Sequence, residues 1–292
     1  MKFKTLNNGV EMPMLGYGVF QTPPEETEAC VAEALKAGYR LIDTAQAYGN
    51  EEGVGAAVRK SGIPREEVFI TSKIWVSNMN YERAAASIDE TLRKLGTDYV
   101  DLMLLHQMMG DYTGAYRAME DAYKAGKIRA IGVSNCYPER LVDLCLLAEV
   151  PPAVNQIETH PFLQERVAHA NMEDLGVVHE AWAPFAEGRG GLFAHPVLSG
   201  IGAKYGKTAG QVTLRALIQK GVVVIPKTVH RERMEENFDV FGFELDADDL
   251  AAFEALDDPS FSRIFDHHDL PTIKWMLGEL VKGQQLGGAT LY

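Results

Sequence analysis

The sequence has few cysteines, no long apolar run and no excess of positive charge, and each shortage excludes a class of protein. An odd three cysteines without a Cys-x-x-Cys spacing form neither a disulfide framework nor a zinc site. No apolar run approaches the ~20 residues of a membrane span, and the start of the chain lacks the apolar stretch of a secretory signal. A net charge of −13 argues against binding to nucleic acid or to a membrane surface. We therefore expect a soluble, cytosolic protein.

The cysteines and histidines do not indicate metal chemistry. Cys30 and Cys145 lie in helical patterns, where a small core residue is the simplest interpretation. Cys136 follows a predicted strand, so a redox role there stays open beside a structural one. The eight histidines show no metal-ligand spacing, and we expect no metal site.

Short apolar segments alternate with amphipathic helical segments along most of the chain. The predicted strands are residues 15–18, 40–43, 68–73, 100–106, 128–134, 154–158, 177–182 and 222–226. The predicted helices are residues 25–37, 51–60, 81–95, 115–125, 138–147, 163–175, 208–219 and 231–237.

Eight strand–helix units whose strands are apolar on both faces predict an α/β fold, a closed (β/α)8 TIM barrel. We expect a single domain over residues 1–292. Asn8-Gly9 between two short extended runs predicts an N-terminal β-hairpin. The C-terminal tail from Phe261 onward is rich in aromatic residues, and we expect it to pack over the barrel mouth.

Four polar residues end or closely follow three successive predicted strands. Asp43 ends one strand and Tyr48 follows it, Lys73 ends the next, and His106 ends the third. Singly, each has an ordinary explanation as a solvated charge, a loop aromatic or a near-core histidine. Together they lie at one mouth of the barrel, where barrel enzymes carry their active sites.

This combination predicts proton delivery to a carbonyl oxygen. Lys73 would stabilise a phenolate and so lower the pKa of Tyr48 from its reference value of about 10. Asp43 would keep Lys73 charged, and His106 would orient and polarise the carbonyl group.

A nucleotide site is indicated at the last strand. No Gly-x-Gly-x-x-Gly follows a strand, so the Rossmann fingerprint is absent. Residues 225–237 open a short helix where barrels often bind phosphate, and Lys227, Thr228 and Arg233 offer two cations and a hydroxyl. The alternative, a solvated helix face neutralised by neighbouring glutamates, stays open.

Three segments together resemble the signatures of the aldo-keto reductase family, and the resemblance covers nearly the whole chain. They are residues 38–51 (GYRLIDTAQAYGNE), 92–106 (LRKLGTDYVDLMLLH) and 225–237 (IPKTVHRERMEEN). The resemblance implies NADPH bound across the barrel mouth, with aldehyde or ketone carbonyls reduced to alcohols by hydride transfer. It implies Tyr48 as general acid, Lys73 and Asp43 as its tuning pair, and His106 as the carbonyl-orienting group.

The resemblance also implies a set of cofactor-binding residues. Ser134, Asn135 and Gln156 would hold the nicotinamide carboxamide, and Trp182 would stack on the ring where many members use tyrosine. Lys227, Thr228 and Arg233 would bind the 2′-phosphate, and Glu236 and Asn237 would bind the adenine. The full set of cofactor-binding residues is Asp43, Ser134, Asn135, Gln156, Trp182, Lys227, Thr228, Arg233, Glu236 and Asn237.

The substrate pocket departs from the family pattern. Many members continue Trp-Pro after the catalytic histidine, whereas this chain continues Gln-Met-Met. We expect pocket walls of Phe20, Trp75, Gln107, Met108 and Met109, and broad specificity, because methionine-lined pockets repack easily. We expect a monomer that acts on a small carbonyl compound.

Two other functions stay open. A regulatory member of the family would bind NADPH without turnover. A barrel aldolase or isomerase would form a Schiff base on Lys73, but that chemistry needs an uncharged lysine, and Asp43 would keep Lys73 protonated.

Overall fold

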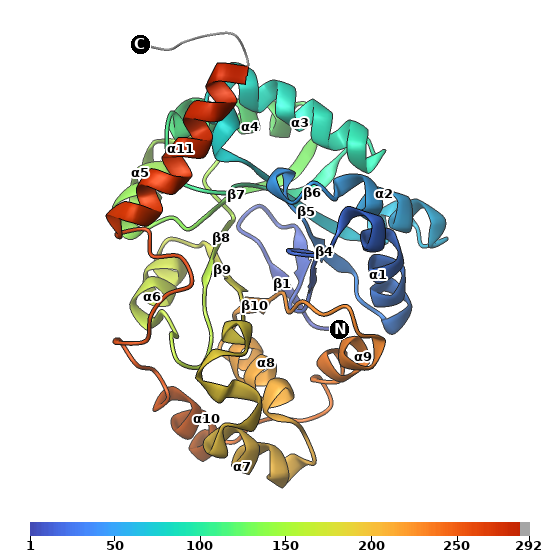
Figure 1. The fold of residues 1–292 in the computed structure, drawn as a ribbon, viewed down its shortest axis with the longest axis vertical. Coiled ribbons are helices and arrows are strands. Elements are labelled where there is room, and N and C mark those ends of the chain that lie inside the picture. The colour runs from blue at the N-terminus through green and yellow to red at the C-terminus, as the bar shows by residue number, and fades with distance from the viewer. Residues whose placement is uncertain (287–292) are drawn as a thin grey trace.

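Eight parallel strands form the centre of the structure, and helices surround them (Figure 1). The structure is a computed structural model that describes residues 1–286. In sheet order the strands are β3 (Tyr17–Gly18), β4 (Leu41–Asp43), β5 (Phe69–Ile74), β6 (Val100–Leu105), β7 (Ile128–Ser134), β8 (Val154–Glu158), β9 (Val178–Trp182) and β10 (Val223–Val224).

A parallel bridge between Leu15 and Val224 joins the first strand segment to the last. The Gly16 amide donates to the Val224 carbonyl at 2.8 Å, and the Val224 amide donates to the Met14 carbonyl at 3.0 Å. These bonds close the ring, and the predicted (β/α)8 barrel is confirmed.

The helices follow the strands in the order that a barrel requires. They are α1 (Pro24–Ala37), α2 (Glu51–Lys60), α3 (Tyr81–Leu95), α4 (Tyr112–Lys124), α5 (Pro138–Leu147), α6 (Arg166–Asp174), α7 (Pro196–Tyr205), α8 (Ala209–Gln219), α9 (Arg231–Phe238), α10 (Ala247–Glu254) and α11 (Leu270–Leu286). Short 3-10 turns add η1 (Gln46–Tyr48), η2 (Arg65–Glu67), η3 (Val76–Asn78) and η4 (Ala186–Ala194). No helix of residues 1–286 is long and apolar enough to cross a bilayer.

The observed helices differ from the sequence predictions at several bounds, and α7 and α11 have no counterpart among the predicted helices. The helix expected at 163–175 begins only at Arg166, because His160 and Leu163 pair as an antiparallel bridge first. Helix α7 was not predicted, since Gly200 and Gly202 lower its helix propensity. A Cβ on Gly202 would lie 2.3 Å from the Lys207 carbonyl oxygen, so close packing at the helix end requires this glycine.

The predicted hairpin closes the lower end of the barrel, which is the end where the parallel strands begin. Strand β1 (Phe3–Thr5) pairs antiparallel with β2 (Glu11–Pro13). Leu6 and Met12 are buried in a cluster with apolar residues near the beginnings of the barrel strands. This end of the barrel is therefore sealed by apolar side chains, and the opposite end carries the polar residues.

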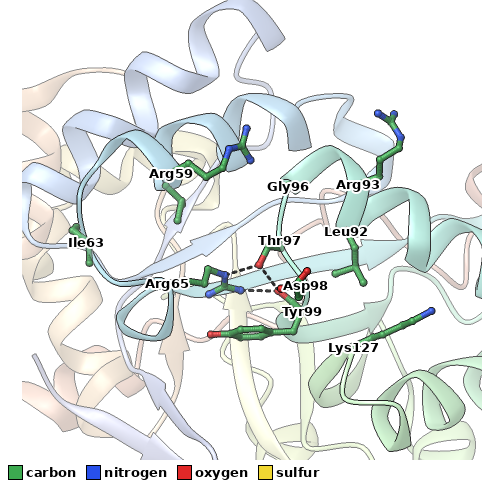
Figure 2. A pocket seen from close by; sticks show the side chains of 11 residues that line it. Arg59, Ile63, Arg65, Leu92, Arg93, Gly96, Thr97, Asp98, Tyr99 and Lys127 are labelled. Atoms are coloured by element: carbon green, nitrogen blue, oxygen red, sulfur yellow. Dashed lines mark hydrogen bonds between the residues drawn. The ribbon is translucent and has the colours of Figure 1, made fainter.

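A surface cavity of about 810 Å³ lies beside the lower end, between α2, α3 and the approaches to β5 and β6 (Figure 2). It contains several basic residues, of which Arg65 and Lys127 are already paired. Arg65 donates to the Thr97 hydroxyl at 3.0 Å, the Tyr99 carbonyl at 2.9 Å and Asp101 at 2.9 Å. Lys127 is paired with Asp89 at 2.6 Å. None of the predicted catalytic residues lines this cavity.

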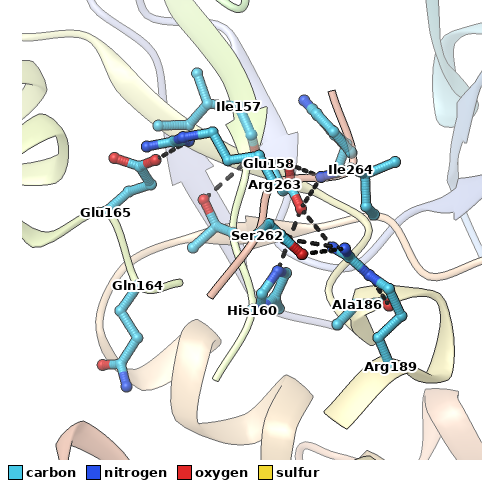
Figure 3. Close-up of polar contacts among 12 residues, drawn as sticks. Ile157, Glu158, His160, Gln164, Glu165, Ala186, Arg189, Ser262, Arg263 and Ile264 are labelled. Atoms are coloured by element: carbon cyan, nitrogen blue, oxygen red, sulfur yellow. Dashed lines mark hydrogen bonds and ion pairs between the residues drawn. The ribbon is translucent and has the colours of Figure 1, made fainter. Parts of the chain in front are cut away.

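The tail is anchored at the carboxyl end of β8 by a buried carboxylate, Glu158 (Figure 3). Glu158 accepts hydrogen bonds from the Ile264 amide at 3.0 and 2.9 Å and from Arg189 at 3.2 Å. Arg189 also donates to the Ser262 carbonyl at 2.9 Å. From this anchor the chain crosses the mouth to α11, which packs against η3, so the predicted position of the tail is confirmed as far as residue 286. Residues 287–292 of the predicted domain lie outside the described residues.

We expect Glu158→Gln to destabilise the protein by about 3 kcal/mol, because breaking a buried charge network leaves its other members without their partner. Glu90→Gln is the control, since Glu90 forms an exposed pair with Arg93 and its loss should cost at most about 0.5 kcal/mol. Urea denaturation measures both. Equal stability of the two variants would contradict the anchoring role of Glu158.

Candidate active site

A cavity of about 650 Å³ opens at the carboxyl ends of the strands. Many of the predicted site residues line it together: Phe20, Asp43, Tyr48, Trp75, His106, Gln107, Ser134, Asn135, Gln156, Trp182 and Lys227. Residues from distant parts of the chain meet there because each follows or ends a strand of the same parallel barrel.

Lys73 lies at the centre of the predicted tetrad. Its ammonium nitrogen is 2.5 Å from Asp43 Oδ1, donates to the Thr44 carbonyl at 3.0 Å, and lies 3.4 Å from the Tyr48 hydroxyl. Lys73 is fully buried, whereas the ring of Tyr48 is partly exposed at the mouth. The turn η1, which ends at a left-handed Gly49 with φ of 68°, carries Tyr48 back over the end of β5.

Aromatic rings hold Tyr48 and His106 in place. The Tyr48 ring centroid lies 5.6 Å from that of His106 and 5.0 Å from that of Phe20, and the Trp75 ring lies 5.0 Å from His106. The backbone amide of His106 donates to the Ile74 carbonyl at 3.0 Å, which continues the β5–β6 ladder to the histidine. The phenol, which follows β4, and the imidazole, which follows β6, therefore face one cavity from the two sides of β5.

The sequence predicts that Lys73 lowers the pKa of Tyr48 below its reference value, and this prediction is wrong. Burial raises the pKa of Tyr48 above its ordinary value, although the charge of Lys73 acts to lower it. Burial alone would lower the pKa of Lys73, but Asp43 and Tyr48 outweigh burial and raise it. Tyr48 is therefore a phenol at neutral pH and Lys73 an ammonium, which suits a proton donor and opposes a Schiff base on Lys73.

His106 is uncharged at neutral pH. Burial lowers the pKa of His106 well below its ordinary value, and the charges of Lys73 and His267 act in the same direction. Its Nδ1 is buried without a hydrogen-bond partner among the described residues. A proton on Nδ1 would have no acceptor, so we assign the proton to Nε2.

Polar residues on β7, β8 and β9 form a connected floor. The Ser134 hydroxyl donates to the Gln156 carbonyl at 2.8 Å, and the Asn135 amide donates to the His106 carbonyl at 3.1 Å. Trp182 Nε1 donates to Asn135 Oδ1 at 3.0 Å. Asn135 holds a left-handed φ of 54°, a conformation that asparagine tolerates better than most residues. These bonds fix the side chains predicted to hold the nicotinamide.

The basic residues after β10 are not neutralised by nearby carboxylates. Lys227 and Arg233 are exposed, and neither lies within ion-pair distance of a carboxylate of residues 1–286. Glu235 is paired with Arg231 at 2.9 Å, and Glu236 accepts from the Thr208 hydroxyl at 2.7 Å. The alternative of a neutralised helix face is therefore not supported.

The other residues predicted at the phosphate and adenine lie beyond the 650 Å³ cavity, on the turn before α9 and on α9 itself. Thr228 is buried, and its hydroxyl accepts from the His230 amide at 3.1 Å. Asn237 is buried and Glu236 is exposed.

The prediction that Met108 and Met109 form a pocket wall is wrong, because neither lines the cavity. Met108 is buried in the apolar core, and its carbonyl accepts a hydrogen bond from Arg140. The tail takes their place with Phe265, Trp275 and Met276, which line the cavity. The sequence signal was the aromatic content of the tail, which indicated that it packs but not which residues face inward.

Cys136 is buried, and burial raises the pKa of its thiol far above the ordinary value. The thiolate, which is the reactive form, is therefore absent at neutral pH. A redox role for Cys136 is disfavoured, and the structural interpretation holds.

Sequence reasoning missed Glu180 on β9, an acidic residue that contacts the site through Gln156. It is fully buried, and its Oε2 accepts from Gln156 Nε2 at 2.9 Å, while the same nitrogen donates to Asp43 Oδ2 at 2.9 Å. Its spacing from Trp182 could have identified it in the sequence. Glu180 stands two residues before Trp182, so both side chains point to the same face of the strand.

The fold and the site define a (β/α)8-barrel protein with a buried Asp–Lys pair beside a phenol and an imidazole in its mouth. The sequence model of the aldo/keto reductase family matches residues 14–258. The chain belongs to this family.

Relatives and solved structures agree with this assignment. The chain is 45% identical over 258 residues to an aldo-keto reductase of Mycobacterium sp. (strain JLS), covering 87% of this chain and 93% of the relative. It is 46% identical over 254 residues to glyoxal reductase of Bacillus subtilis, covering 86% and 91%. The structure of a Bombyx mori aldo-keto reductase in complex with NADP is similar with a TM-score of 0.86 at 31% identity, covering 92% of this chain and 96% of that one.

We expect brief treatment of the native protein with iodoacetamide to leave Cys136 and Cys30 unmodified, because both are buried and burial raises the pKa of both thiols. Cys145, which is only half-buried, is the expected first site of modification. Mass spectrometry of tryptic peptides measures this, and the urea-unfolded protein is the control in which all three thiols react. Early modification of Cys136 would contradict its buried position.

Proposed function

We propose that this protein reduces aldehyde and ketone carbonyls to alcohols with NADPH as the hydride donor. The observation that carries this proposal is the position of the Lys73 ammonium, 2.5 Å from Asp43 and 3.4 Å from the Tyr48 hydroxyl, at a cavity that His106 also lines. A proton donor and an orienting group at one cavity are what carbonyl reduction requires of the protein.

The residues present fit NADPH in two places. The hydrogen-bonded floor of Ser134, Asn135 and Gln156, next to Trp182, offers amide and hydroxyl groups for a carboxamide and an indole for an aromatic ring. Lys227 and Arg233 offer two unneutralised cations, which suit a phosphate monoester. When bound, NADPH supplies the hydride that adds to the carbonyl carbon.

The protein's own part in the reaction is to place the carbonyl and to supply a proton. His106 Nε2–H donates to the carbonyl oxygen and orients it toward the phenol. Tyr48 gives its hydroxyl proton to the same oxygen as the carbonyl carbon gains the hydride, so the product is a neutral alcohol. The phenolate left on Tyr48 is stabilised by the Lys73 ammonium, which Asp43 holds in place, until the phenol regains a proton from solvent.

The substrate is, on this proposal, a small aldehyde or α-dicarbonyl compound with an apolar or aromatic substituent. The cavity of about 650 Å³ is lined by Phe20, Trp75, Phe265 and Trp275, whose rings favour apolar groups. The similarity to a protein named glyoxal reductase supports the dicarbonyl class.

A regulatory protein that binds NADPH without turnover is the alternative. A binding protein has no need of a phenol held beside a buried ammonium, so the unbroken tetrad favours the enzyme.

We expect Tyr48→Phe to lower NADPH-dependent reduction of phenylglyoxal by roughly 10²–10⁴-fold or more, because general acid catalysis contributes that much. The Kd for NADPH, measured by quenching of tryptophan fluorescence, should stay nearly unchanged. Tyr81→Phe is the control, since its hydroxyl donates to Asp121 at an exposed position away from the cavity. Substantial residual turnover in Tyr48→Phe would contradict the assignment of the proton donor.

We expect Arg233→Ala to weaken NADPH binding by about ten- to a hundredfold, because one charge-assisted hydrogen bond contributes roughly 1.5–3 kcal/mol. Binding of NADH, which lacks the 2′-phosphate, should change little. Arg231→Ala on the same helix is the control, since Arg231 is already paired with Glu235 and Glu33. Equal weakening of NADPH and NADH by Arg233→Ala would show that the cations do not bind a phosphate.

A further inference from the structure

Glu180 lies beneath the floor of the cavity and is not a member of the tetrad of Asp43, Tyr48, Lys73 and His106. It is fully buried on β9 beside its register partners, Gln156 on β8 and Val223 on β10. Its Oε2 accepts from Gln156 Nε2 at 2.9 Å, and its Oε1 is buried without a partner among residues 1–286. A buried carboxyl group with one unpartnered oxygen requires a physical explanation.

The charged and titratable groups facing Glu180 come from the opposite side of the barrel. They are Asp43 on β4, Tyr48 on η1 and Lys73 on β5, while its strand neighbours on β8 and β10 are uncharged. One ammonium thus faces two carboxyl groups. Asp43 is in direct contact with that ammonium at 2.5 Å, so Glu180 is the carboxyl group that carries the proton.

The pKa of Glu180 agrees with this assignment. Burial, together with the charge of Asp43, raises the pKa of Glu180 to about 8, while the hydrogen bond from Gln156 and the charge of Lys73 act to lower it. At neutral pH the side chain is therefore an uncharged carboxylic acid.

Gln156 connects the two carboxyl groups across the interior of the barrel. Its one amide nitrogen donates to Asp43 Oδ2 and to Glu180 Oε2, both at 2.9 Å. Strands β4 and β8 are four apart in the eight-strand order, so the bond to Asp43 reaches from one side of the ring to the other. Both protons of the Gln156 amide nitrogen are used, which fixes the orientation of the amide.

We propose that Glu180 is a positioning residue for carbonyl reduction: through the amide of Gln156 it fixes Asp43, which holds Lys73 beside Tyr48. This inference rests on the proposed function. Without the acceptor on Glu180, one amide proton of Gln156 has no partner and the amide is free to turn. Asp43 Oδ2 then loses its donor, and Lys73 is held less firmly beside the phenol.

Ionisation of Glu180 has a further consequence. A negative charge at Glu180 acts to raise the pKa of Tyr48 and so makes the phenol a poorer proton donor. Reductive kcat should therefore fall as the pH rises through about 8. Tyr48 does not cause this fall, because burial keeps its own pKa above the ordinary value of 10.

The experiment compares the wild type with Glu180→Leu and Glu180→Gln over a range of pH, with phenylglyoxal and NADPH. At pH 7 we expect Glu180→Leu to lose kcat by about tenfold, the effect of one lost buried hydrogen bond. Glu180→Gln should restore most of that loss, because its amide oxygen accepts from Gln156 as the carboxyl does. The alkaline fall in kcat should be present in the wild type and move to higher pH in Glu180→Gln.

Thermal stability gives a readout that does not depend on activity. Between the ordinary carboxyl pKa of 4.5 and about 8, the unfolded state has lost the Glu180 proton and the folded state keeps it. Wild-type stability therefore contains a contribution that is fully present below pH 4.5 and is lost as pH rises toward 8. Glu180→Gln lacks this contribution, so its Tm relative to wild type should rise steadily from pH 5 to pH 8.5.

The outcomes separate this inference from the proposed function. A wild type that consumes no NADPH with any carbonyl compound contradicts the proposed function. An active wild type whose alkaline fall in kcat and pH-dependent Tm are both shared by Glu180→Gln contradicts the role of Glu180 alone. If Glu180→Leu does not fold, Glu180→Gln still decides the matter through both readouts.

Discussion

The buried ion pair between Asp43 and Lys73 is the interaction on which the site depends. Both side chains lie inside the barrel mouth at 2.5 Å, and neither would be stable there alone, since an unpaired buried charge is costly. The pair keeps Lys73 an ammonium in spite of its burial, and that ammonium faces the hydroxyl of Tyr48. The parallel barrel makes this possible because adjacent strands deliver both residues to the same rim.

Burial and the charges of this pair together set the protonation states of the neighbouring groups. Burial lowers the pKa of His106, and the charge of Lys73 lowers it further, so the imidazole is neutral. Burial raises the pKa of Tyr48, and the charge of Lys73 partly opposes this effect. Burial, together with the charge of Asp43, raises the pKa of Glu180, so Glu180 keeps its proton. The result is a neutral phenol, a neutral imidazole and a neutral acid around one ion pair. The two donors that line the cavity for a carbonyl oxygen, the Tyr48 phenol and the His106 imidazole, are therefore uncharged.

Much of the fold could be predicted from the sequence because strand and helix periods alternate regularly. Strands β7 and β8 and helices α2, α3 and α5 have the predicted bounds, and the four tetrad residues meet as their strand positions indicated. The failures depend on tertiary contacts. Helix α7 was not predicted because its two glycines lower the helix propensity of the segment. Trp275 and Met276 line the cavity only because of the path that the tail takes across the barrel mouth. The raised pKa of Tyr48 depends on how deeply its hydroxyl is buried, which no local pattern records.

The central claim is that the ion pair, the phenol and the imidazole serve hydride transfer to a carbonyl group. The most direct measurement is incubation of the protein with phenylglyoxal and NADPH carrying deuterium at the transferable position of the nicotinamide ring, followed by mass spectrometry of the products. Our account predicts an alcohol that carries one deuterium on the former carbonyl carbon. Recovery of unreacted phenylglyoxal, or of an alcohol without deuterium, would contradict it.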